Sequence, residues 1–584
     1  MYTPTQTQIA RRYEVVPEEK SGGATYTPKN LSDFVAEQII ACVDSNKLKQ
    51  PLRVLDPAVG DGMLLVSLLE QLTKVHCSTI EVFGFDTNEN AVKYASRQLQ
   101  QLFPNISFHL ETGNFLEFVV DHFGASDNSD LFKSSVIGAF DIIIANPPYV
   151  RTQILGAKQA NLLARQYGLS GRIDLYYAFL LGMGKVLTPG GIAGIIVSNR
   201  FMTTKSGRAV RRNILDQFKV LHVWDMGDTR FFEAAVLPAV LLLAGMRKDG
   251  NSVNHKPHFT SIYSTDEASK KCASDPIAAL RESGVVEVSD GRRFLIQHGL
   301  LDHGNKAEGV WRIATENSDR WLLCVKAHTW STFSRVGKIR VGVKTTADKV
   351  FIRSDWDDLP EDERPELLRP LTTHHGARRF KYAQPQTLKQ IIYPHQMVHS
   401  RRCTIDLSEY PRAAAYFNRH KTTLESREYV IEAGRKWYEI WVPHNPDDWA
   451  KPKIVFRDIS EKPTFWMDLE GTVVNGDCYW LTCNDESQID WLWLSLAVGN
   501  STFIEAFYDH RFNNKLYAGR RRFITQYVEK FPLPDPDTAL AKSIIEMTKR
   551  IYTLVPSAEA DALDKVLDGL IWQAFGLSAE KAVG

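Results

Sequence analysis

The chain has 584 residues, of which 44% are hydrophobic and 24% are charged, and its formal net charge is +1. This length is too great for one ordinary hydrophobic core, so we expect a soluble globular protein of roughly two or three domains. The nearly neutral charge excludes a protein that binds polyanions through bulk charge, and any basic surface is expected to be local.

The cysteines and the apolar segments of the sequence indicate the cellular compartment in which the protein is expected. The seven cysteines form no CxxC pair, which favours a reducing cytoplasm over a disulfide scaffold. Cys478 and Cys483 lie close in sequence, but no second pair of ligands accompanies them, so we predict no metal site. The first residues lack the apolar core of a signal peptide, and no run approaches the roughly 18 apolar residues of a membrane helix. We therefore expect a cytoplasmic protein with no membrane partner.

Strands and helices alternate in the first part of the chain. Residues 52–70 and 78–102 each show an apolar strand followed by a turn and an amphipathic helix. Residues 140–149 supply a further strand, and residues 174–199 a helix, a Pro-Gly-Gly turn and another strand. This alternation predicts an α/β domain with a parallel sheet covered on both faces. Ligands of such sheets lie beyond the carboxyl ends of the strands, where we expect the functional residues.

The first two strands end in a pattern that indicates a nucleoside ligand. The sequence DPAVGDG follows the first strand, and its glycines, Gly60 and Gly62, permit a tight turn and close approach of a ligand. The second strand ends at Asp86, whose carboxylate can accept hydrogen bonds from both hydroxyls of a ribose. Leu65 replaces the third glycine of a dinucleotide fingerprint, which disfavours a pyrophosphate. A nucleoside without phosphates, such as S-adenosylmethionine, fits better, and its positive groups suit Asp56.

The strand over residues 140–145 ends at Asn146, Pro147, Pro148 and Tyr149. The side-chain oxygen of Asn146 and the carbonyl of Pro147 can accept the hydrogens of an exocyclic amine, which makes its nitrogen more pyramidal and more nucleophilic. The prolines fix φ, so both acceptors are held before the substrate arrives. Tyr149 offers a flat face to a planar substrate. The tetrapeptide therefore predicts methyl transfer to an amine conjugated to a ring.

The order of these motifs resembles that of the gamma-class N6-adenine DNA methyltransferases, the TaqI-like family of type II modification enzymes, over nearly the whole chain. The resemblance implies a Rossmann-like catalytic domain that uses S-adenosylmethionine. In the segment GNFLEF, Asn114 stands where the family usually carries Asp, and an amide can still receive the adenine amino group. The implied cofactor contacts are Tyr26, Thr27, Pro28, Asp56, Ala58, Gly60, Gly62, Asp86, Asn114 and Asn146.

The resemblance also implies an aromatic residue that stacks on the target base, and the register of RFFEAAVLPAV favours Phe232 over Phe231. An adenine inside duplex DNA cannot reach the sheet edge, so the base must be flipped out. Tyr149 and Phe232 are then the expected faces of its slot. The implied catalytic residues are Asn146, Pro147, Pro148, Tyr149 and Phe232.

The second part of the chain resembles the family's target-recognition domain, which we expect to be mixed α+β. We predict a catalytic domain over residues 1–246, an interdomain connection over 247–310, a recognition domain over 311–540 and a helical tail over 541–584. Basic side chains on a groove wall suit contacts to phosphates. The predicted DNA-binding residues are Lys344, Thr345, Arg378, Arg379, Arg401, Arg402, Arg520 and Arg521.

The predicted function is transfer of a methyl group to N6 of a flipped adenine in double-stranded DNA, within a restriction–modification or phage-defence system. We expect a monomer. Glu18, Glu19 and Lys20 fit the E-x-K part of a nuclease site, but only 17 residues precede them, so a cognate endonuclease is expected on a separate chain. One alternative is an RNA or protein-glutamine methyltransferase, which also uses Asn-Pro-Pro-Tyr but usually lacks such a C-terminal domain. The other is a non-catalytic DNA-binding subunit, which the intact motifs disfavour.

Overall fold

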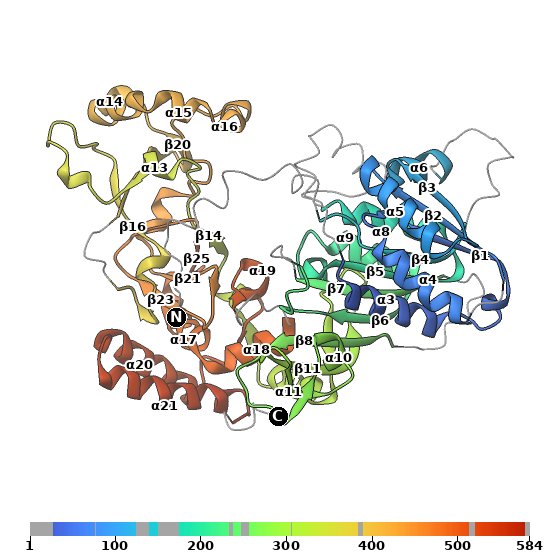
Figure 1. Ribbon diagram of the computed structural model, residues 1–584. Coiled ribbons are helices and arrows are strands. Elements are labelled where there is room, and N and C mark those ends of the chain that lie inside the picture. Colours follow the sequence, from blue (N-terminus) through green and yellow to red (C-terminus); the bar gives the residue numbers. More distant parts are fainter. Residues whose placement is uncertain are drawn as a thin grey trace. The chain divides into compact units, whose positions relative to one another are not determined.

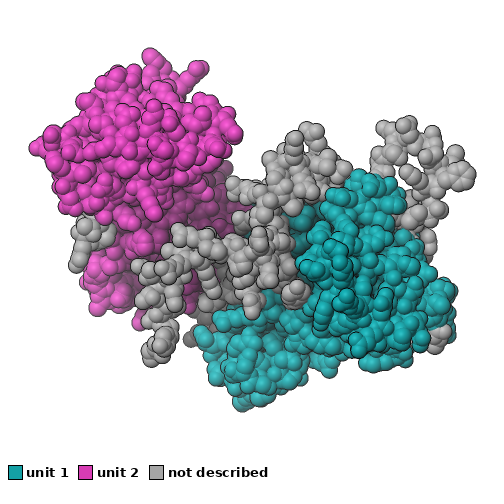
Figure 2. All heavy atoms as spheres, turned by 45° about the horizontal axis from the view of Figure 1, so that its top comes forward, with its two compact units in different colours: residues 1–315, 516–518 teal, residues 316–515, 519–584 magenta. Residues whose placement is uncertain are grey.

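The computed structural model describes residues 27–75, 78–123, 139–149, 174–232, 237–246, 256–304, 306–383, 389–512 and 520–578. They form two compact units, coloured teal and magenta in Figure 2: unit 1 holds the described residues up to Thr315, and unit 2 those from Glu316 onward. Tyr26 and the E-x-K motif at residues 18–20 lie outside the described residues. No helix in the described ranges is long and apolar enough to cross a membrane.

Unit 1 is built on one large sheet (Figure 1). Its strands are β1 (Leu52–Asp56), β2 (Ile80–Asp86), β3 (Ser107–Thr112), β4 (Phe140–Ala145), β5 (Leu187–Ser198), β6 (Phe218–Asp225), β7 (Pro238–Gly245), β8 (His258–Ser264), β9 (Lys271–Ala273), β10 (Gly284–Val288), β11 (Arg293–Asp302) and β12 (Arg312–Ala314). Their order is β3-β2-β1-β4-β5-β7-β6-β8-β11-β10-β9, and β12 pairs with β11. The strands from β3 to β5 are parallel, and β7 runs antiparallel to β5 and β6.

Helices cover both faces of the parallel part. Val54 and Ile142 pack in a core with three of the helices, whereas their neighbours Leu55 and Ile143 pack in a second core with the other three, because successive strand residues point to opposite faces. This doubly wound arrangement confirms the predicted α/β fold. The order reverses between β1 and β4, which is where such sheets bind ligands. The two sets of helices are α3 (Lys29–Cys42), α4 (Met63–Val75) and α5 (Glu89–Leu102), and α6 (Phe115–Phe123), α8 (Tyr176–Val186) and α9 (Arg208–Gln217).

The predicted interdomain connection over 247–310 is wrong for residues 258–302, which form strands of the same sheet. β8 lies parallel to β6, β11 lies antiparallel to β8, and the short helix α10 (Pro276–Ala279) packs beside them. The pattern misled because β8 buries polar residues: Thr260 and Ser261 are 2% and 1% exposed, and the Thr260 hydroxyl lies 2.9 Å from His222 Nε2. The compact unit therefore extends to Thr315 rather than ending near residue 246.

Unit 2 is mixed α+β, as predicted, with a five-stranded sheet β14-β25-β21-β23-β17 and a four-stranded sheet β15-β18-β16-β24 among the described residues. Its strands are β13 (Ser331–Thr332), β14 (Ile339–Val341), β15 (Ile352–Arg353), β16 (Leu368–Thr372), β17 (Phe380–Lys381), β18 (Gln390–Ile392), β19 (His395–Val398), β20 (Arg401–Thr404), β21 (Lys453–Arg457), β22 (Ile459–Ser460), β23 (Phe465–Asp468), β24 (Val473–Val474), β25 (Cys478–Thr482), β26 (Arg521–Arg522) and β27 (Pro532–Leu533).

The helices of unit 2 pack on these sheets. The last two of them begin at residue 539, two residues before the tail predicted over 541–584. Their Ile544, Ile551 and Trp572 lie in one buried core with Leu496 of the apolar helix at residues 489–500. The helices are α11 (Glu316–Ala327), α12 (Phe333–Val336), α13 (Asp348–Phe351), α14 (Pro411–Arg419), α15 (Lys421–Glu425), α16 (Glu428–Glu432), α17 (Ile489–Asn500), α18 (Thr502–Phe512), α19 (Thr525–Val528), α20 (Ala539–Leu554) and α21 (Ala558–Ala574).

Candidate active site

The segments that follow β1, β2 and β3 are tied together at the carboxyl edge of the sheet. The backbone N–H of Gly60, in the turn after β1, donates to Asp86 Oδ2 at the end of β2 over 2.9 Å. The N–H of Gly113, after β3, donates to the Asp86 carbonyl over 2.9 Å. Asn114 directly precedes α6, and its Oδ1 accepts from the N–H of Leu116 over 3.0 Å. The predicted cofactor residues of three strands thus share one edge.

The two glycines of the first turn have different roles. Gly60 and Gly62 adopt φ of 54° and 81°, a left-handed conformation that other residues rarely take. A Cβ on Gly62 would lie 3.1 Å from Ala95 Cβ on α5, so this glycine lets two helices pack. A Cβ on Gly60 would have no described atom within 4 Å. The space beside Gly60 is therefore open to a ligand.

Asp56, at the end of β1, is a fully buried carboxyl group. Its Oδ1 accepts from the N–H of Ala58 over 3.0 Å, whereas its Oδ2 has no hydrogen-bond partner among the described residues. Burial, and then the carboxylates of Asp86 and Asp61, raises the pKa of Asp56 from 3.8 to about 8. A buried acceptor without a partner is costly unless a ligand supplies a donor or a positive charge. Asp56 is thus placed to receive a cationic group.

This burial predicts a pH dependence of stability in the ligand-free protein. The folded pKa of Asp56, about 8, lies above its ordinary value of 3.8. The contribution of this carboxyl group to the stability of the folded protein is therefore fully present below pH 4 and is lost as the pH rises through 8. We expect the free energy of unfolding to fall with pH between 5 and 8 more steeply than in Asp56→Asn, by about 1 kcal/mol per pH unit. Urea titrations at several pH values measure both slopes, and parallel curves for the two proteins would contradict the prediction.

The residues that follow β4 hold the predicted acceptor in place. The Asn146 side-chain amide donates from Nδ2 to Thr27 Oγ1 over 3.0 Å, and its Oδ1 accepts from the Tyr149 hydroxyl over 2.7 Å. Pro147, which lies between Asn146 and Tyr149 in the sequence, is buried. Burial raises the pKa of Tyr149 well above its ordinary value, so the phenol remains a donor. These two hydrogen bonds therefore fix the direction of the Asn146 oxygen.

Two aromatic rings stand at this loop. The ring centroids of Tyr149 and Phe232 lie 6.4 Å apart with an interplanar angle of 59°, and Phe232 is 7% exposed. Phe231 instead lines a separate pocket, which favours Phe232 as the partner of Tyr149. A planar base stacked between two rings needs them nearly parallel and about 7 Å apart, two stacking distances of about 3.5 Å. At 59° the two rings are not parallel, so at least one of them would have to turn to hold a base in this way.

The predicted DNA-binding residues of unit 2 divide into two sets. Thr345 is fully buried and bonds Asp348 through its hydroxyl. The guanidinium of Arg379 pairs with Asp564 over 2.8 Å, and that of Arg521 forms two bonds of 2.8 and 2.7 Å to Asp509. These three side chains are engaged within the fold. The exposed members are Lys344, Arg378, Arg401, Arg402 and Arg520.

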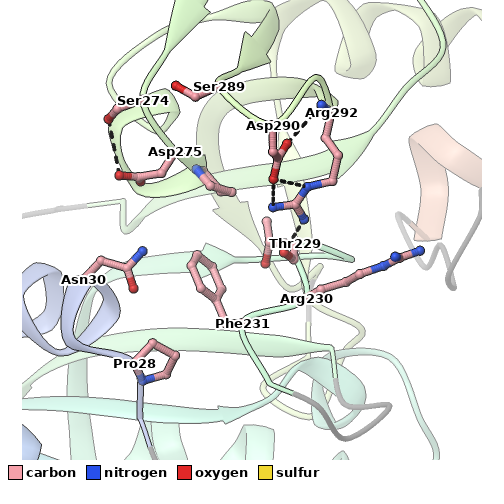
Figure 3. Close-up of a pocket in the computed structure, with 11 residues that line it drawn as sticks. Pro28, Asn30, Thr229, Arg230, Phe231, Ser274, Asp275, Ser289, Asp290 and Arg292 are labelled. Carbon is pink, nitrogen blue, oxygen red and sulfur yellow. Dashed lines mark hydrogen bonds and ion pairs between the residues drawn. The ribbon is translucent and has the colours of Figure 1, made fainter.

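Sequence reasoning missed a group of contacts behind Phe232. Asp225 at the end of β6 accepts from Tyr263, and Thr229 in the segment that follows accepts from Arg292. Both donors come from the region predicted as a connection. A pocket of about 350 Å³ lies beside it (Figure 3). The local sequence gave no indication of these contacts, because an Arg or Tyr in a polar stretch is usually expected to lie at the protein surface.

Comparisons with known proteins agree with this arrangement. Residues 80–232 match the Eco57I restriction-modification methylase family, and residues 401–533 match the TaqI-like C-terminal specificity domain. The chain is 36% identical to the type II methyltransferase M.BanIII of Aneurinibacillus aneurinilyticus, over 97% of this chain and 98% of that protein. It is 23% identical to the type II methyltransferase M.BstVI of Geobacillus stearothermophilus, over 88% and 90% of the two chains.

A similar fold occurs among solved structures. A nuclease-deletion mutant of the Type ISP restriction-modification enzyme LlaGI, in complex with a DNA substrate mimic, has a TM-score of 0.51 and 13% identity. The match covers 94% of this chain and 56% of that one. At this identity the likeness concerns the fold alone.

Proposed function

Because the chain belongs to the TaqI-like type II methyltransferases of restriction–modification systems, and is thus an S-adenosylmethionine-dependent DNA methyltransferase, we propose that it methylates N6 of adenine at one short sequence. Family membership confirms the predicted DNA substrate and cofactor, and it disfavours the RNA and protein alternatives. The observation that carries the adenine proposal is the oriented Asn146 amide at the end of β4.

The cofactor residues fit the group that they are proposed to hold. S-adenosylmethionine, when bound, supplies a methyl group on a positively charged sulfur. The unpartnered Asp56 Oδ2 suits the ammonium of its amino-acid part, and Asp86 keeps lone pairs for ribose hydroxyls beyond those that accept from Gly60 and Asn88. Asn114 bonds Leu116 and Glu117 through its amide, and we propose that it lies near the adenine ring. Thr27 links this site to the acceptor loop through Asn146.

The acceptor loop acts on the target amine. We propose that Asn146 Oδ1 and the Pro147 carbonyl accept its two hydrogens, which concentrates the lone pair on nitrogen. Thr27 and the fixed φ of the prolines hold these oxygens in place, so little reorganisation is needed during the reaction. Tyr149 and Phe232 stack on the flipped base, a contact worth on the order of 1–3 kcal/mol per base. The excess proton leaves to water after transfer, so no strong base is required.

The product tests the choice between adenine and cytosine. We expect N6-methyladenine as the modified nucleoside in DNA from cells that express this chain. The reasons are the Asn at the start of the acceptor motif, where N4-cytosine enzymes of related classes more often carry Ser, the gamma-class order of motifs, and a two-sided aromatic slot suited to a purine. Digestion to nucleosides and mass spectrometry identifies the product. N4-methylcytosine as the main product would refute the adenine assignment.

A second prediction concerns the exposed arginines of unit 2. Arg401 and Arg402 lie on β20, in a hairpin with β19 whose turn at His399 and Ser400 has positive φ at both residues. If both contact phosphates, the double variant Arg401→Ala/Arg402→Ala should reduce the slope of log K against log salt by about 2. Fluorescence anisotropy with a labelled duplex at several salt concentrations measures this slope.

The matched control is Arg419→Ala, since Arg419 is an exposed arginine of the same unit that we do not predict to bind DNA and that pairs with Glu363. It should leave the slope unchanged. An equal slope in the double variant and the control would remove Arg401 and Arg402 from the proposed interface.

A further inference from the structure

The segment that leads from β6 to Phe232 begins in a buried polar network. Asp225, the last residue of β6, is 3% exposed and accepts from the Tyr263 hydroxyl over 2.7 Å and from Asn199 Nδ2 over 3.0 Å. Its Oδ1 also accepts from the N–H of Gly227 over 3.3 Å. The start of the segment is therefore fixed to both β8 and the end of β5.

Two further contacts fix the middle of this segment. Asp228 Oδ1 accepts from the backbone N–H of Ser264, at the end of β8, over 2.8 Å. The carbonyl of Thr229, which is itself 2% exposed, accepts from Arg292 Nη1 over 2.7 Å. Arg292 directly precedes β11, so the second contact joins the β10–β11 hairpin to the turn before Phe232.

The Arg292 side chain lines a cavity, and its guanidinium lies over the Phe294 ring, 5.3 Å from the ring centroid. The pocket of about 350 Å³ is lined by Thr229, Phe231 and Arg292 together with Pro28 and Asp290. Figure 3 shows Arg292 reaching down to Thr229 along one side of this space while Phe231 points into it. The Arg292 guanidinium thus joins the backbone of this turn to the β10–β11 hairpin beside the pocket.

Arg292 is held in this direction before any substrate binds. Its Nε donates to Asp290 Oδ2 over 2.8 Å, and its Nη2 lies 2.7 Å from the same oxygen. Asp290 Oδ1 accepts from the backbone N–H of Arg292 over 3.0 Å, across a turn in which Gly291 has φ of 83°. The carboxylate and the guanidinium thus form a hydrogen-bonded ion pair at the tip of the β10–β11 hairpin.

The residue after Thr229 turns the chain. Arg230 has φ of 60°, a left-handed conformation that a residue with a side chain keeps only where its surroundings fix it. After this turn Phe231 enters the pocket, whereas Phe232 lies beside Tyr149 with ring centroids 6.4 Å apart. The hydrogen bond at Thr229 fixes the residue before the turn.

We infer that Arg292, oriented by Asp290, is a positioning residue that sets the Phe232 ring opposite Tyr149 through the Thr229 carbonyl. The inference rests on the proposed role of Phe232 in stacking on the target base. It assigns a function to the β8–β12 extension of the sheet: this part of unit 1 supports the aromatic slot from behind.

The test uses the full chain and a duplex with 2-aminopurine in place of the modified base, at the recognition sequence found by sequencing methylated DNA. For Arg292→Ala we expect the single-turnover rate of methylation on the normal duplex to fall about 10- to 100-fold, because a ring displaced by about 1 Å misplaces the base. The 2-aminopurine fluorescence of the complex should shift toward that of Phe232→Ala. S-adenosylmethionine affinity, measured by calorimetry, should stay within about twofold, since the described hydrogen bonds and ion pairs of Arg292 go to Asp290 and Thr229 and not to a proposed cofactor residue.

Arg293→Ala is the matched control, because Arg293 is the next residue and its Nε donates to Glu287 over 2.8 Å, whereas Arg292 donates to the Thr229 carbonyl. Arg292→Lys retains a donor for Thr229 but loses the paired contact with Asp290, and it should be intermediate. Equal rates and fluorescence in Arg292→Ala and Arg293→Ala would overturn the inference, as would a loss of cofactor affinity in both Arg292 variants. If Phe232→Ala itself changes neither signal, the proposed stacking role has failed instead.

Discussion

Replacing Asn146 with Ala is expected to lower the single-turnover rate of methylation by roughly 10²- to 10³-fold, by analogy with the loss of one preorganised hydrogen-bond partner of a reacting atom. The side chain at this position supplies the acceptor that Thr27 and Tyr149 orient over 3.0 and 2.7 Å. Alanine removes the acceptor and leaves the strand intact, because Asn146 follows the end of β4. Rapid-quench measurement of methyl transfer under enzyme excess isolates the chemical step.

Two further variants separate the acceptor from its supports. Asn146→Asp keeps an oxygen acceptor but loses the donor to Thr27, and Tyr149→Phe keeps the ring but loses the hydroxyl that bonds Asn146. Both should be slower than the unaltered protein and faster than Asn146→Ala. Cofactor affinity is measured separately, since Asn146 bonds Thr27 beside the proposed cofactor site. A nearly normal transfer rate in Asn146→Ala would refute the proposed role.

Replacing Lys453 with Met is expected to destabilise the protein by about 3–5 kcal/mol, the usual cost of leaving one partner of a buried ion pair without its counter-charge. Lys453 on β21 is fully buried, and its Nζ lies 2.8 Å from Oδ2 of Asp468, which is 6% exposed on the paired strand β23. Nζ also donates to the Trp449 carbonyl over 2.7 Å. Asp468 in turn accepts from the Thr472 hydroxyl over 2.6 Å. Urea unfolding measures the loss.

The nearby Lys451 offers a matched control. It is half-exposed and lies 3.5 Å from Asp448, so Lys451→Met should cost less than about 1 kcal/mol. The double variant Lys453→Met/Asp468→Leu removes both charges and should recover part of the stability lost in the single variant. Equal unfolding midpoints for Lys451→Met and Lys453→Met would contradict the prediction that an unpaired buried Asp468 is costly.

Local patterns in the sequence were sufficient for the parallel, doubly wound part of the catalytic sheet, from β3 to β5 in the strand order, and for the edge at which the proposed site lies. The alternation of strands and amphipathic helices predicted the doubly wound sheet, which the strand order confirms. Asp56, Asp86 and Asn146 could be placed at one edge because each directly follows or ends a strand, and parallel strands share their carboxyl ends. Such positions depend only on contacts close in sequence and on one general rule of sheet geometry.

The tertiary structure alone decided the partners of residues far apart in the chain. Arg521 and Arg401 look alike in sequence, yet Arg521 is paired with Asp509 inside unit 2 and Arg401 is exposed. In the same way Arg292 lies 63 positions from Thr229, to which it donates. A charged side chain has the same local pattern whether its partner is a carboxylate, a carbonyl or a phosphate. Its role is fixed by which strands pair and by what then lies within about 3 Å of it, and that follows from packing of the whole unit.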